Sequence, residues 1–260
     1  MPNKGIKMSK KFNNNTAPKF SLILYGRHAV TAAINNSERK IIKLLCTKEN
    51  AEEAKTLCAQ RNLPTNILNI VERKEIDRLL PQDAVHQGFA LYCSELPEYD
   101  LEDICILAEQ KEDCHILILD QVTDPQNIGA IIRSCVAFDT LALIMQDKNS
   151  PAENGAMVKA SAGTIEHLPI CRVTNLTRAI NRLKDAGFWT VGMDGYAQTT
   201  IDKMNKKGKI ALIMGSEGKG MRRLVEESCD TTVRLPISEK VESLNVSTAA
   251  AIALYEVNKK

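Results

Sequence analysis

A polar turn near the middle of the chain carries side chains that could bind an anion. An apolar strand ends at Asp120, and a helix with a buried apolar face follows from Asn127. In α/β sheets, turns at the carboxyl ends of strands form the binding crevice. Asn127 is placed to cap the helix, and Gly129 lets another backbone or a ligand come close. Arg133 lies among apolar residues, so its guanidinium needs an anionic partner: a bound phosphate, or the carboxylate of Asp120 or Asp124.

A glycine-rich turn follows a second apolar strand and supplies another candidate site. Gly215, Gly218 and Gly220 fall within six residues of each other. Their order is not the dinucleotide-binding fingerprint G-x-G-x-x-G, and it is not a P-loop, because Gly220 follows Lys219. Such a turn either brings its backbone against a ligand or only reverses the chain, and both interpretations stay open. Glu217, inside the turn, is a candidate hydrogen-bond acceptor or a local cap.

A third polar stretch separates a strand from the last helix. The strand runs into Pro236, and Ser243 and Asn245 stand just before an alanine-rich helix predicted over 247–259. The small residues 247–251 allow this helix to pack closely against a neighbour. The compact polar side chains of Ser243 and Asn245 could serve a site, or they could only cap the helix.

Alternating strands and helices must position these three stretches, and they fall into two groups. Residues 20–97 form a small α/β unit, and residues 114–260 predict a mostly parallel sheet covered on both faces. The strands expected in the first unit are 22–25, 41–46, 67–70 and 88–92, and its helices are 29–34, 51–61 and 72–80. The strands expected in the second unit are 115–120, 141–145, 189–193, 210–214 and 232–235, and its helices are 127–138, 177–186, 221–228 and 247–259.

Charge is distributed unevenly along the 260 residues, although the net charge is only +2. Residues 1–19 contain lysines and no acidic residue, and they predict a disordered basic tail. An acidic linker is predicted over 98–113, with a short helix over 101–108. The near-neutral total is therefore a cationic segment cancelled by an acidic one, and it permits a nucleic-acid partner without indicating one.

Composition and cysteine spacing limit the class of protein. With 44% hydrophobic and 25% charged residues, the composition is globular, not that of a disordered, collagen-like or membrane protein. No stretch has the length of a membrane span or the apolar core of a secretory signal. Eight cysteines without a C-x-x-C pair, and four histidines without ligand spacing, predict buried thiols in a reducing cytoplasm and no metal site.

In their order and spacing, the three stretches resemble the motifs of the SpoU (TrmH-like) family of RNA 2′-O-ribose methyltransferases, in the SPOUT superfamily. The first unit is also similar to the family's substrate-binding domain, and the resemblance covers roughly residues 20–257. The matching motifs are Asn127-x-Gly129-x-x-x-Arg133, Gly215-Ser-Glu217-Gly-Lys-Gly220 and Ser243-Leu-Asn245-Val-Ser247, with Gly26-Arg-His28 and His86-Gln-Gly88 in the first unit.

The resemblance implies a fold, a cofactor and partners. The implied fold is an α/β domain with a C-terminal trefoil knot, preceded by a small α/β RNA-binding domain of the L30e/L7Ae type. The implied cofactor is S-adenosylmethionine, the implied substrate is a guanosine of large-subunit (23S) ribosomal RNA, and the C-terminal domain is implied to form a homodimer. Cofactor-binding positions of the family match Gly215, Leu235 and Leu244, with Met214, Gly220 and Ile237 nearby.

The resemblance also assigns catalytic roles. It gives Arg133 the removal of the proton from the 2′-hydroxyl, although a guanidinium holds its own proton almost always. We therefore expect Arg133 to bind the phosphate beside the target ribose and to polarise the hydroxyl. Asn127, Glu217, Ser243 and Asn245 would then hold Arg133, the ribose and the ends of the cofactor in place.

One residue departs from the family pattern. Glu239 stands where many members have glycine in the third motif. A glycine there can adopt a positive φ, whereas a glutamate does so only at an energetic cost. The conformation of the loop that contains Glu239 therefore cannot be carried over from the family.

Three functions remain open after these observations. The first is 2′-O-methylation of ribosomal RNA, the second is the same reaction on tRNA, and the third is a non-catalytic RNA-binding or ribosome-assembly protein. Residues 20–97 favour ribosomal RNA, because minimal tRNA enzymes of the family usually lack this unit. The presence of Arg133, Glu217 and Asn245 argues against a non-catalytic protein. A nicotinamide-dependent dehydrogenase is excluded by the missing G-x-G-x-x-G.

Overall fold

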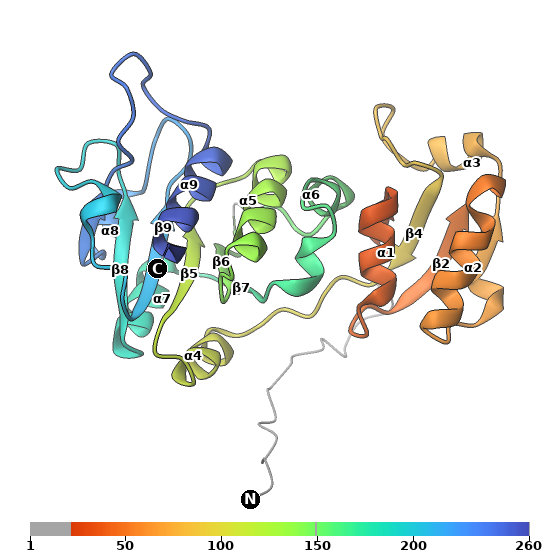
Figure 1. The fold of residues 1–260 in the computed structure, drawn as a ribbon, viewed down its shortest axis with the longest axis horizontal. Coiled ribbons are helices and arrows are strands. Elements are labelled where there is room, and N and C mark those ends of the chain that lie inside the picture. Colours follow the sequence, from red (N-terminus) through yellow and green to blue (C-terminus); the bar gives the residue numbers. More distant parts are fainter. Residues whose placement is uncertain (1–21, 149, 260) are drawn as a thin grey trace, which may run out of the picture.

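The computed structural model describes residues 22–148 and 150–259, so the basic tail predicted over 1–19 lies outside the described residues. The described chain forms two α/β units that lie side by side, a larger one that carries the C-terminus and a smaller one built from the first strands (Figure 1). Within the described part of the chain, no helix is long and apolar enough to cross a membrane.

The smaller unit is built on a mixed four-stranded sheet of order β1-β4-β2-β3. Strand β4 runs antiparallel to β1 and β2, whereas β2 and β3 are parallel. The elements are β1 (Leu22–Tyr25), α1 (Arg27–Asn35), β2 (Ile41–Cys46), α2 (Ala51–Gln60), β3 (Leu68–Ile70), α3 (Arg73–Asp77) and β4 (Phe89–Cys93). The helix predicted over 72–80 is shorter than expected and ends at Asp77. Pro81 has no backbone N–H to donate to the Asp77 carbonyl, so the helix cannot continue through Leu80.

The segment predicted as an acidic linker contains a packed helix, α4 (Leu101–Glu109). Asp100 and Asp103 form a capping box at its start, in which the Asp100 N–H donates to Asp103 Oδ2 (3.0 Å). Ile104 and Cys105 are buried against the larger sheet. The helix predicted over 101–108 is thus present, and its apolar residues belong to the core of the larger unit.

The larger unit is built on a six-stranded sheet in which every pair is parallel, as predicted. The strand order is β10-β8-β9-β5-β6-β7, so the strands that carry the first two motifs are neighbours. The strands are β5 (Cys114–Leu119), β6 (Leu143–Gln146), β7 (Ile170–Val173), β8 (Phe188–Met193), β9 (Lys209–Met214) and β10 (Thr231–Val233).

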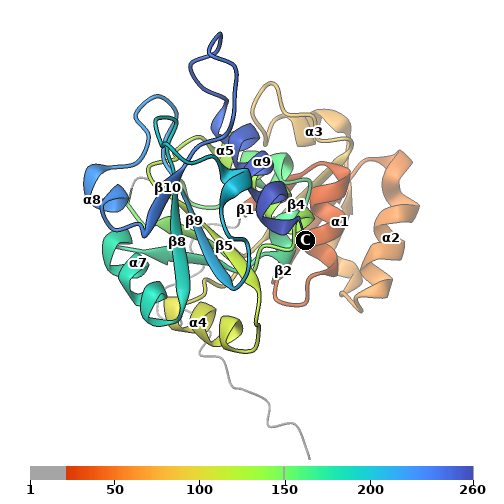
Figure 2. The same cartoon turned by 60° about the vertical axis from the view of Figure 1, so that its left-hand side comes forward.

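Helices cover both faces of the larger sheet (Figures 1 and 2). Successive residues of β5 point to opposite faces: Leu117 and Leu119 pack with α5 and α9, whereas Ile116 and Ile118 pack with α4 and α7. The short elements α6 and β7 were not predicted, because so few residues show no clear period. The remaining helices are α5 (Pro125–Ala137), α6 (Gly155–Ala160), α7 (Leu176–Asp185), α8 (Arg223–Glu226) and α9 (Val246–Asn258).

Gly129 marks the place where α5 and α6 cross. A Cβ atom at this position would lie 2.4 Å from the carbonyl oxygen of Met157 and 2.6 Å from the Cβ of Ala160. The close approach predicted at Gly129 is therefore confirmed, and its partner is a second backbone within the chain. This contact holds the start of α5, and with it the first motif, against the body of the larger unit.

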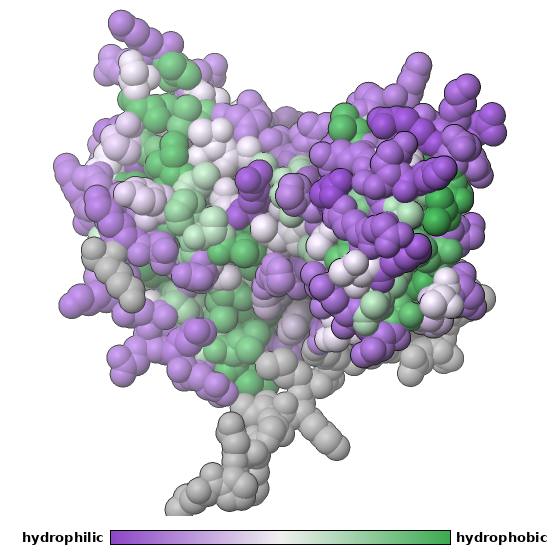
Figure 3. All heavy atoms as spheres, turned by 45° about the vertical axis from the view of Figure 1, so that its right-hand side comes forward, coloured by the Kyte–Doolittle hydropathy of each residue, from purple (hydrophilic) through white to green (hydrophobic). Residues whose placement is uncertain are grey.

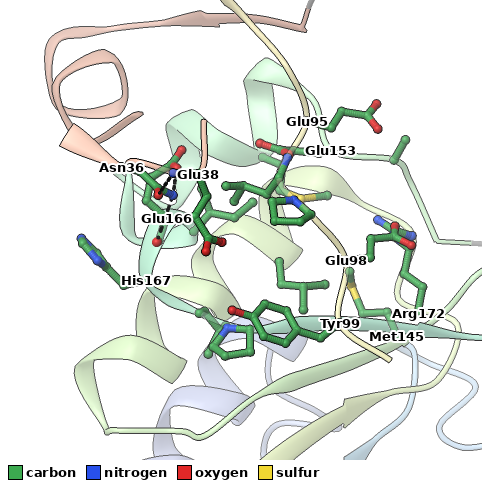
Figure 4. A pocket seen from close by; sticks show the side chains of 18 of the residues that line it. Asn36, Glu38, Glu95, Glu98, Tyr99, Met145, Glu153, Glu166, His167 and Arg172 are labelled. Atoms are coloured by element: carbon green, nitrogen blue, oxygen red, sulfur yellow. Dashed lines mark hydrogen bonds and ion pairs between the residues drawn. The ribbon is translucent and has the colours of Figure 1, made fainter. Parts of the chain in front are cut away.

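A buried cluster of charged side chains joins the two units. Arg39, in the smaller unit, donates hydrogen bonds to the carboxylates of Glu153 and Glu166 in the larger one. Arg39 Nη2 lies 2.7 Å from Glu166 Oε1, and Asn36 Nδ2 lies 2.7 Å from Glu166 Oε2 (Figure 4). Burial lowers the pKa of Arg39, but the hydrogen bonds and charges of the two glutamates outweigh burial and raise that pKa. Arg39 therefore stays charged inside the interface.

The cysteines are free thiols and most of them are buried, as their spacing predicts. Burial raises the pKa of Cys93 and of Cys135 to about 12. Because the thiolate is the reactive form of cysteine, these two side chains serve the core and take no part in chemistry near neutral pH.

Candidate functional site

The carboxyl ends of three neighbouring strands, β8, β9 and β10, surround a hollow in the larger unit. Its volume is about 820 Å³, which suits a small organic ligand, and its place agrees with the rule that parallel sheets bind ligands beyond the carboxyl ends of their strands. All six residues that the sequence assigned to cofactor binding line this hollow: Met214, Gly215, Gly220, Leu235, Ile237 and Leu244.

The glycine-rich turn forms a closed loop on one wall of the hollow. The Ser216 N–H donates to the Gly220 carbonyl (3.1 Å), and the Gly220 N–H donates to the Ser216 carbonyl (2.9 Å). Gly218 and Gly220 have φ values of +80° and +66°, which favour glycine. A Cβ on Gly215 would lie 2.0 Å from the carbonyl carbon of Gly220. The loop therefore reverses the chain sharply, and it also forms part of the wall of the hollow.

The first and third motifs meet beside the hollow. Asn245 Nδ2 donates to Asn127 Oδ1 (3.1 Å), and Asn245 Oδ1 accepts the Ser247 N–H (2.9 Å), which caps α9. The expectation that Asn127 caps α5 is wrong. Asp124 caps it by accepting the Gln126 N–H (3.0 Å), because the proline after Asp124 occupies the first helical position. The side chain of Asn127 is thus left to join α5 to the start of α9.

Arg133 is exposed on α5 and does not line the hollow. It lies six residues after Asn127, about 9 Å further along the helix and on a different face. The two carboxylates that could have paired with it are engaged elsewhere, since Asp120 binds Arg222 and Asp124 caps α5. Among the described residues, no hydrogen bond or ion pair involves the Arg133 side chain, so its guanidinium is available to an external anion.

The other catalytic candidates lie at or next to the hollow. Glu217 and Ser243 line it, and Asn245 follows Leu244, which also lines it. Glu239 is part of the same wall, but it does not take a positive φ. The replacement of glycine by glutamate at this position therefore introduces no backbone strain.

The loop after β8 also lines the hollow, although none of its residues was predicted as a site residue. Met193 and Asp194 form part of the wall together with Tyr196, whose side chain is 87% exposed. Asp194 Oδ1 accepts the Tyr196 N–H (3.1 Å). The Asp-Gly pair directly after the strand predicted over 189–193 was the available signal, because it marks a turn at the carboxyl end of a strand.

The lining of the hollow carries more acidic than basic side chains. This excess favours a ligand with a positive charge over a dinucleotide or a free phosphate. Within the described residues, no group of three or more His, Cys, Asp or Glu side chains could hold a metal ion. The acidic side chains are Asp194, Glu217, Glu226, Glu239 and Glu242, and the basic ones are Lys219 and Arg234.

A second hollow, of about 500 Å³, lies between the two units beside the Arg39 cluster (Figure 4). Its lining includes Glu38, Glu95 and Glu98. Arg172 Nε pairs with Glu98 Oε1 at 3.0 Å. None of the site residues predicted from the sequence lines this second hollow.

Family models match both units of the chain. The SpoU rRNA methylase family matches residues 115–255, and the substrate-binding domain of RNA 2′-O-ribose methyltransferases matches residues 23–99. The chain belongs to the SpoU rRNA methylase family. The two matches also divide the chain close to the place where the smaller sheet ends and α4 begins.

Individual relatives agree with the family match. The chain is 36% identical over 238 residues to the 23S rRNA (guanosine-2′-O-)-methyltransferase RlmB of Shewanella oneidensis, a match over 90% of this chain and 95% of that protein. It is 34% identical to RlmB of Yersinia pestis, over 91% of this chain and 96% of that protein. The crystal structure of the SpoU methyltransferase AviRb from Streptomyces viridochromogenes, in complex with AdoMet, has the same fold, with a TM-score of 0.77 at 23% identity over 92% of this chain and 89% of AviRb.

Proposed function

We propose that the protein transfers a methyl group from S-adenosylmethionine to the ribose 2′-hydroxyl of a guanosine in 23S ribosomal RNA. The observation that carries this proposal is the joint position of three motifs. The glycine-rich loop, Leu235 and Leu244 line one hollow, and the Asn127–Asn245 hydrogen bond brings the first motif to its edge. The RlmB relatives, which match almost the full chain, supply the substrate.

The hollow fits S-adenosylmethionine in size and charge. Its volume of about 820 Å³ exceeds what a cofactor of this size requires, and its acidic lining complements the positive sulfonium and ammonium groups. When bound, the cofactor supplies a methyl group on a positively charged sulfur. Gly215 and the other glycines of the loop allow the backbone to approach the cofactor without side chains in between.

In this proposal the side chains of the chain orient the ribose. The activation barrier of methyl transfer is lowered chiefly by holding the 2′-oxygen of the ribose in line with the methyl group and the sulfur. The free guanidinium of Arg133 binds the phosphate beside the target ribose and polarises the 2′-hydroxyl. Asn127 and Asn245 hold the start of α9 against α5, and Glu217 and Ser243 contact the cofactor and the ribose from the wall of the hollow.

The smaller unit is proposed to bind the RNA around the target nucleotide. Hydrophilic side chains cover most of the face that this unit presents in Figure 3. Among the lysines of this unit, Lys40, Lys43 and Lys48 are exposed. Phosphate contacts from such side chains do not depend on the RNA sequence. The proposal includes an L30e/L7Ae-type fold for this unit, the trefoil knot of the family in the larger unit, and action in the cytoplasm.

A homodimer through α9 is part of the proposal. Ile252 and Tyr255 on this helix are 43% and 54% exposed, and the Phe138 ring of α5 packs edge-on against the Tyr255 ring at 5.9 Å. Burying such apolar side chains between two copies favours association. Light scattering should therefore give twice the mass of one chain, and Tyr255→Asp should reduce it to one chain mass. A wild-type protein that is a monomer at micromolar concentration would refute the dimer.

We expect Gly215→Ala to weaken binding of S-adenosylmethionine by at least about tenfold, because the added methyl group displaces the loop at Gly220. Isothermal titration calorimetry with the cofactor measures the change. The matched control is Gly195→Ala, which adds the same methyl group at the same hollow but meets no protein atom within 4 Å. Equal affinities of the two variants would show that the loop does not shape the cofactor site.

Mapping of ribose methylation in cells that lack the protein tests the proposed function directly. The expected result is the loss of one 2′-O-methyl guanosine in 23S ribosomal RNA, restored by the wild-type gene. Loss of a 2′-O-methylated nucleotide in tRNA would instead identify tRNA as the substrate. Unchanged methylation of both RNAs, together with a defect in large-subunit assembly, would favour a non-catalytic assembly factor.

A further inference from the structure

Asp120, at the carboxyl end of β5, contacts the chain on both sides of the glycine-rich loop. Its backbone N–H donates to the carbonyl of Met214 (2.8 Å), the last residue before the loop. Its carboxylate accepts the backbone N–H of Arg222 (2.8 Å), just after the loop. One residue therefore binds the chain immediately before and immediately after the segment Gly215–Met221.

The side chain of Arg222 completes this arrangement. Arg222 Nε and Nη2 both lie 2.8 Å from Asp120 Oδ1, and Nη2 also donates to Gln146 Oε1 at the end of β6 (3.1 Å). The guanidinium thus ties the loop to two neighbouring strand ends at once. A lysine has one ammonium group and cannot reproduce this planar set of contacts.

Because Asp120 is buried, loss of its contact with Arg222 would leave a carboxylate without its charged partner. The Asp120 side chain is fully buried, whereas that of Arg222 is 38% exposed. A buried carboxylate requires a charged or hydrogen-bonding partner, and Arg222 supplies it with two hydrogen bonds and an ion pair. The following residue, Gln121, has a φ of +60°, which is uncommon for a residue other than glycine. Such a backbone conformation persists only where the surrounding structure enforces it.

We propose that Asp120 and Arg222 are positioning residues that hold the glycine-rich loop in the shape that binds S-adenosylmethionine. The inference rests on the proposed function, because it assigns the loop to the cofactor. Ser216 and Gly220 close the loop on itself, but these bonds do not attach it to the sheet. The Asp120–Arg222 contact makes that attachment and thereby sets where Gly215 and Glu217 lie relative to the hollow.

Arg222→Lys and Arg222→Ala test this proposal with Arg223→Ala as the matched control. Arg223 is the next residue, its side chain is 77% exposed, and it pairs with Glu227, four residues further along the chain. We expect Arg222→Ala to weaken cofactor binding by about 10- to 100-fold, because hydrogen bonds to a charged group are lost. Arg222→Lys keeps a positive charge beside Asp120, so the domain can still fold, and it should bind at least several-fold more weakly than the wild type.

Two measurements separate positioning from a general loss of stability. Calorimetric titration with S-adenosylmethionine gives the affinity, and steady-state kinetics should show a raised KM for the cofactor with an unchanged KM for RNA. Hydrogen exchange of residues 215–221 should be faster in Arg222→Lys than in the wild type and unchanged in Arg223→Ala. An Arg222→Lys protein with wild-type cofactor affinity and wild-type exchange in the loop would overturn the proposal.

The measurements also distinguish an error in the positioning role from an error in the proposed function. If the wild-type protein binds no S-adenosylmethionine, the assigned cofactor is wrong, whatever the variants do. Hydrogen exchange then still decides whether Asp120 and Arg222 hold the loop, because it needs no ligand. Equal exchange in Arg222→Lys and the wild type would reject the positioning role in that case as well.

Discussion

Arg133→Ala should lower the rate of methyl transfer by about 10²–10³-fold or more while the affinity for S-adenosylmethionine stays at the wild-type value. The residue is exposed and lies outside the lining of the hollow, so its loss should not disturb the cofactor. Its guanidinium has no partner among the described side chains, so its loss should not destabilise the fold. Single-turnover methylation of 23S ribosomal RNA and calorimetric cofactor binding measure the two quantities.

The control for this experiment is Arg178→Ala. Arg178 is an exposed arginine on α7, which covers the opposite face of the same sheet. Arg178→Ala removes the same charge from the domain as Arg133→Ala does. It should leave the rate of methyl transfer within about twofold of the wild-type rate, since one surface charge contributes little away from the RNA. Near-normal turnover of Arg133→Ala, or an equal loss in both variants, would contradict the role assigned to Arg133.

Arg133→Lys refines the interpretation. Lysine keeps the positive charge but loses the planar pair of donors that bind a phosphate in two places. We expect an intermediate rate, above that of Arg133→Ala and below that of the wild type. A lysine variant as inactive as the alanine variant would indicate that the geometry of the guanidinium, more than its charge, supports the reaction.

Arg39→Ala should reduce the free energy of unfolding by about 3–5 kcal/mol, because it leaves two buried carboxylates without their cation. The side chains of Arg39 and Glu166 are fully buried, and that of Glu153 is 11% exposed. Differential scanning calorimetry should show a lower melting temperature and a separation of the transitions of the two units, because the cluster is the buried charged contact between them.

Arg182→Ala is the matched control for Arg39→Ala. Arg182 also pairs with a glutamate on a different helix, Glu102, at 2.6 Å, but the two side chains are 37% and 63% exposed. Such an exposed pair contributes about 0–1 kcal/mol. Equal stabilities of Arg39→Ala and Arg182→Ala would show that the buried cluster does not hold the units together.

Arg39→Ala should also change the binding of RNA. Because Arg39 joins the unit that is proposed to bind RNA to the larger unit, Arg39→Ala should weaken binding of the RNA substrate. Its affinity for S-adenosylmethionine should not change, since the hollow lies wholly in the larger unit. A gel-shift assay with an RNA fragment, beside the calorimetric titration, separates the two effects.

Secondary structure was predictable wherever a segment was long and its pattern was regular. The strands expected over 22–25 and 41–46 coincide with β1 and β2, because apolar runs bounded by polar turns are typical of buried strands. The helix expected over 72–80 ends early, and α6 and β7 were missed, because short elements are stabilised by their neighbours more than by their own residues.

The partners of charged side chains were not predictable. Asp120 and Asp124 are near Arg133 in the sequence, yet Asp120 binds Arg222, which is 102 residues away. The contact exists because β5 and β9 are neighbours in the sheet, so the turns at their carboxyl ends meet. No local pattern contains this information, since the order of the strands decides it.

The alternation of strands and helices was sufficient to predict the α/β fold with its parallel sheet. The resemblance of the three motifs to the SpoU family was sufficient to predict the class of the protein and the residues that line the hollow. Those properties depend on short stretches whose chemistry is local. Only the tertiary structure decided four further properties. These are the strand order, the Asp120–Arg222 contact, the buried Arg39 cluster and, among the described residues, the lack of a partner for the Arg133 side chain. Each of these depends on which distant segments the packing of the two sheets brings into contact, and that outcome minimises the free energy of the whole chain rather than of any one motif.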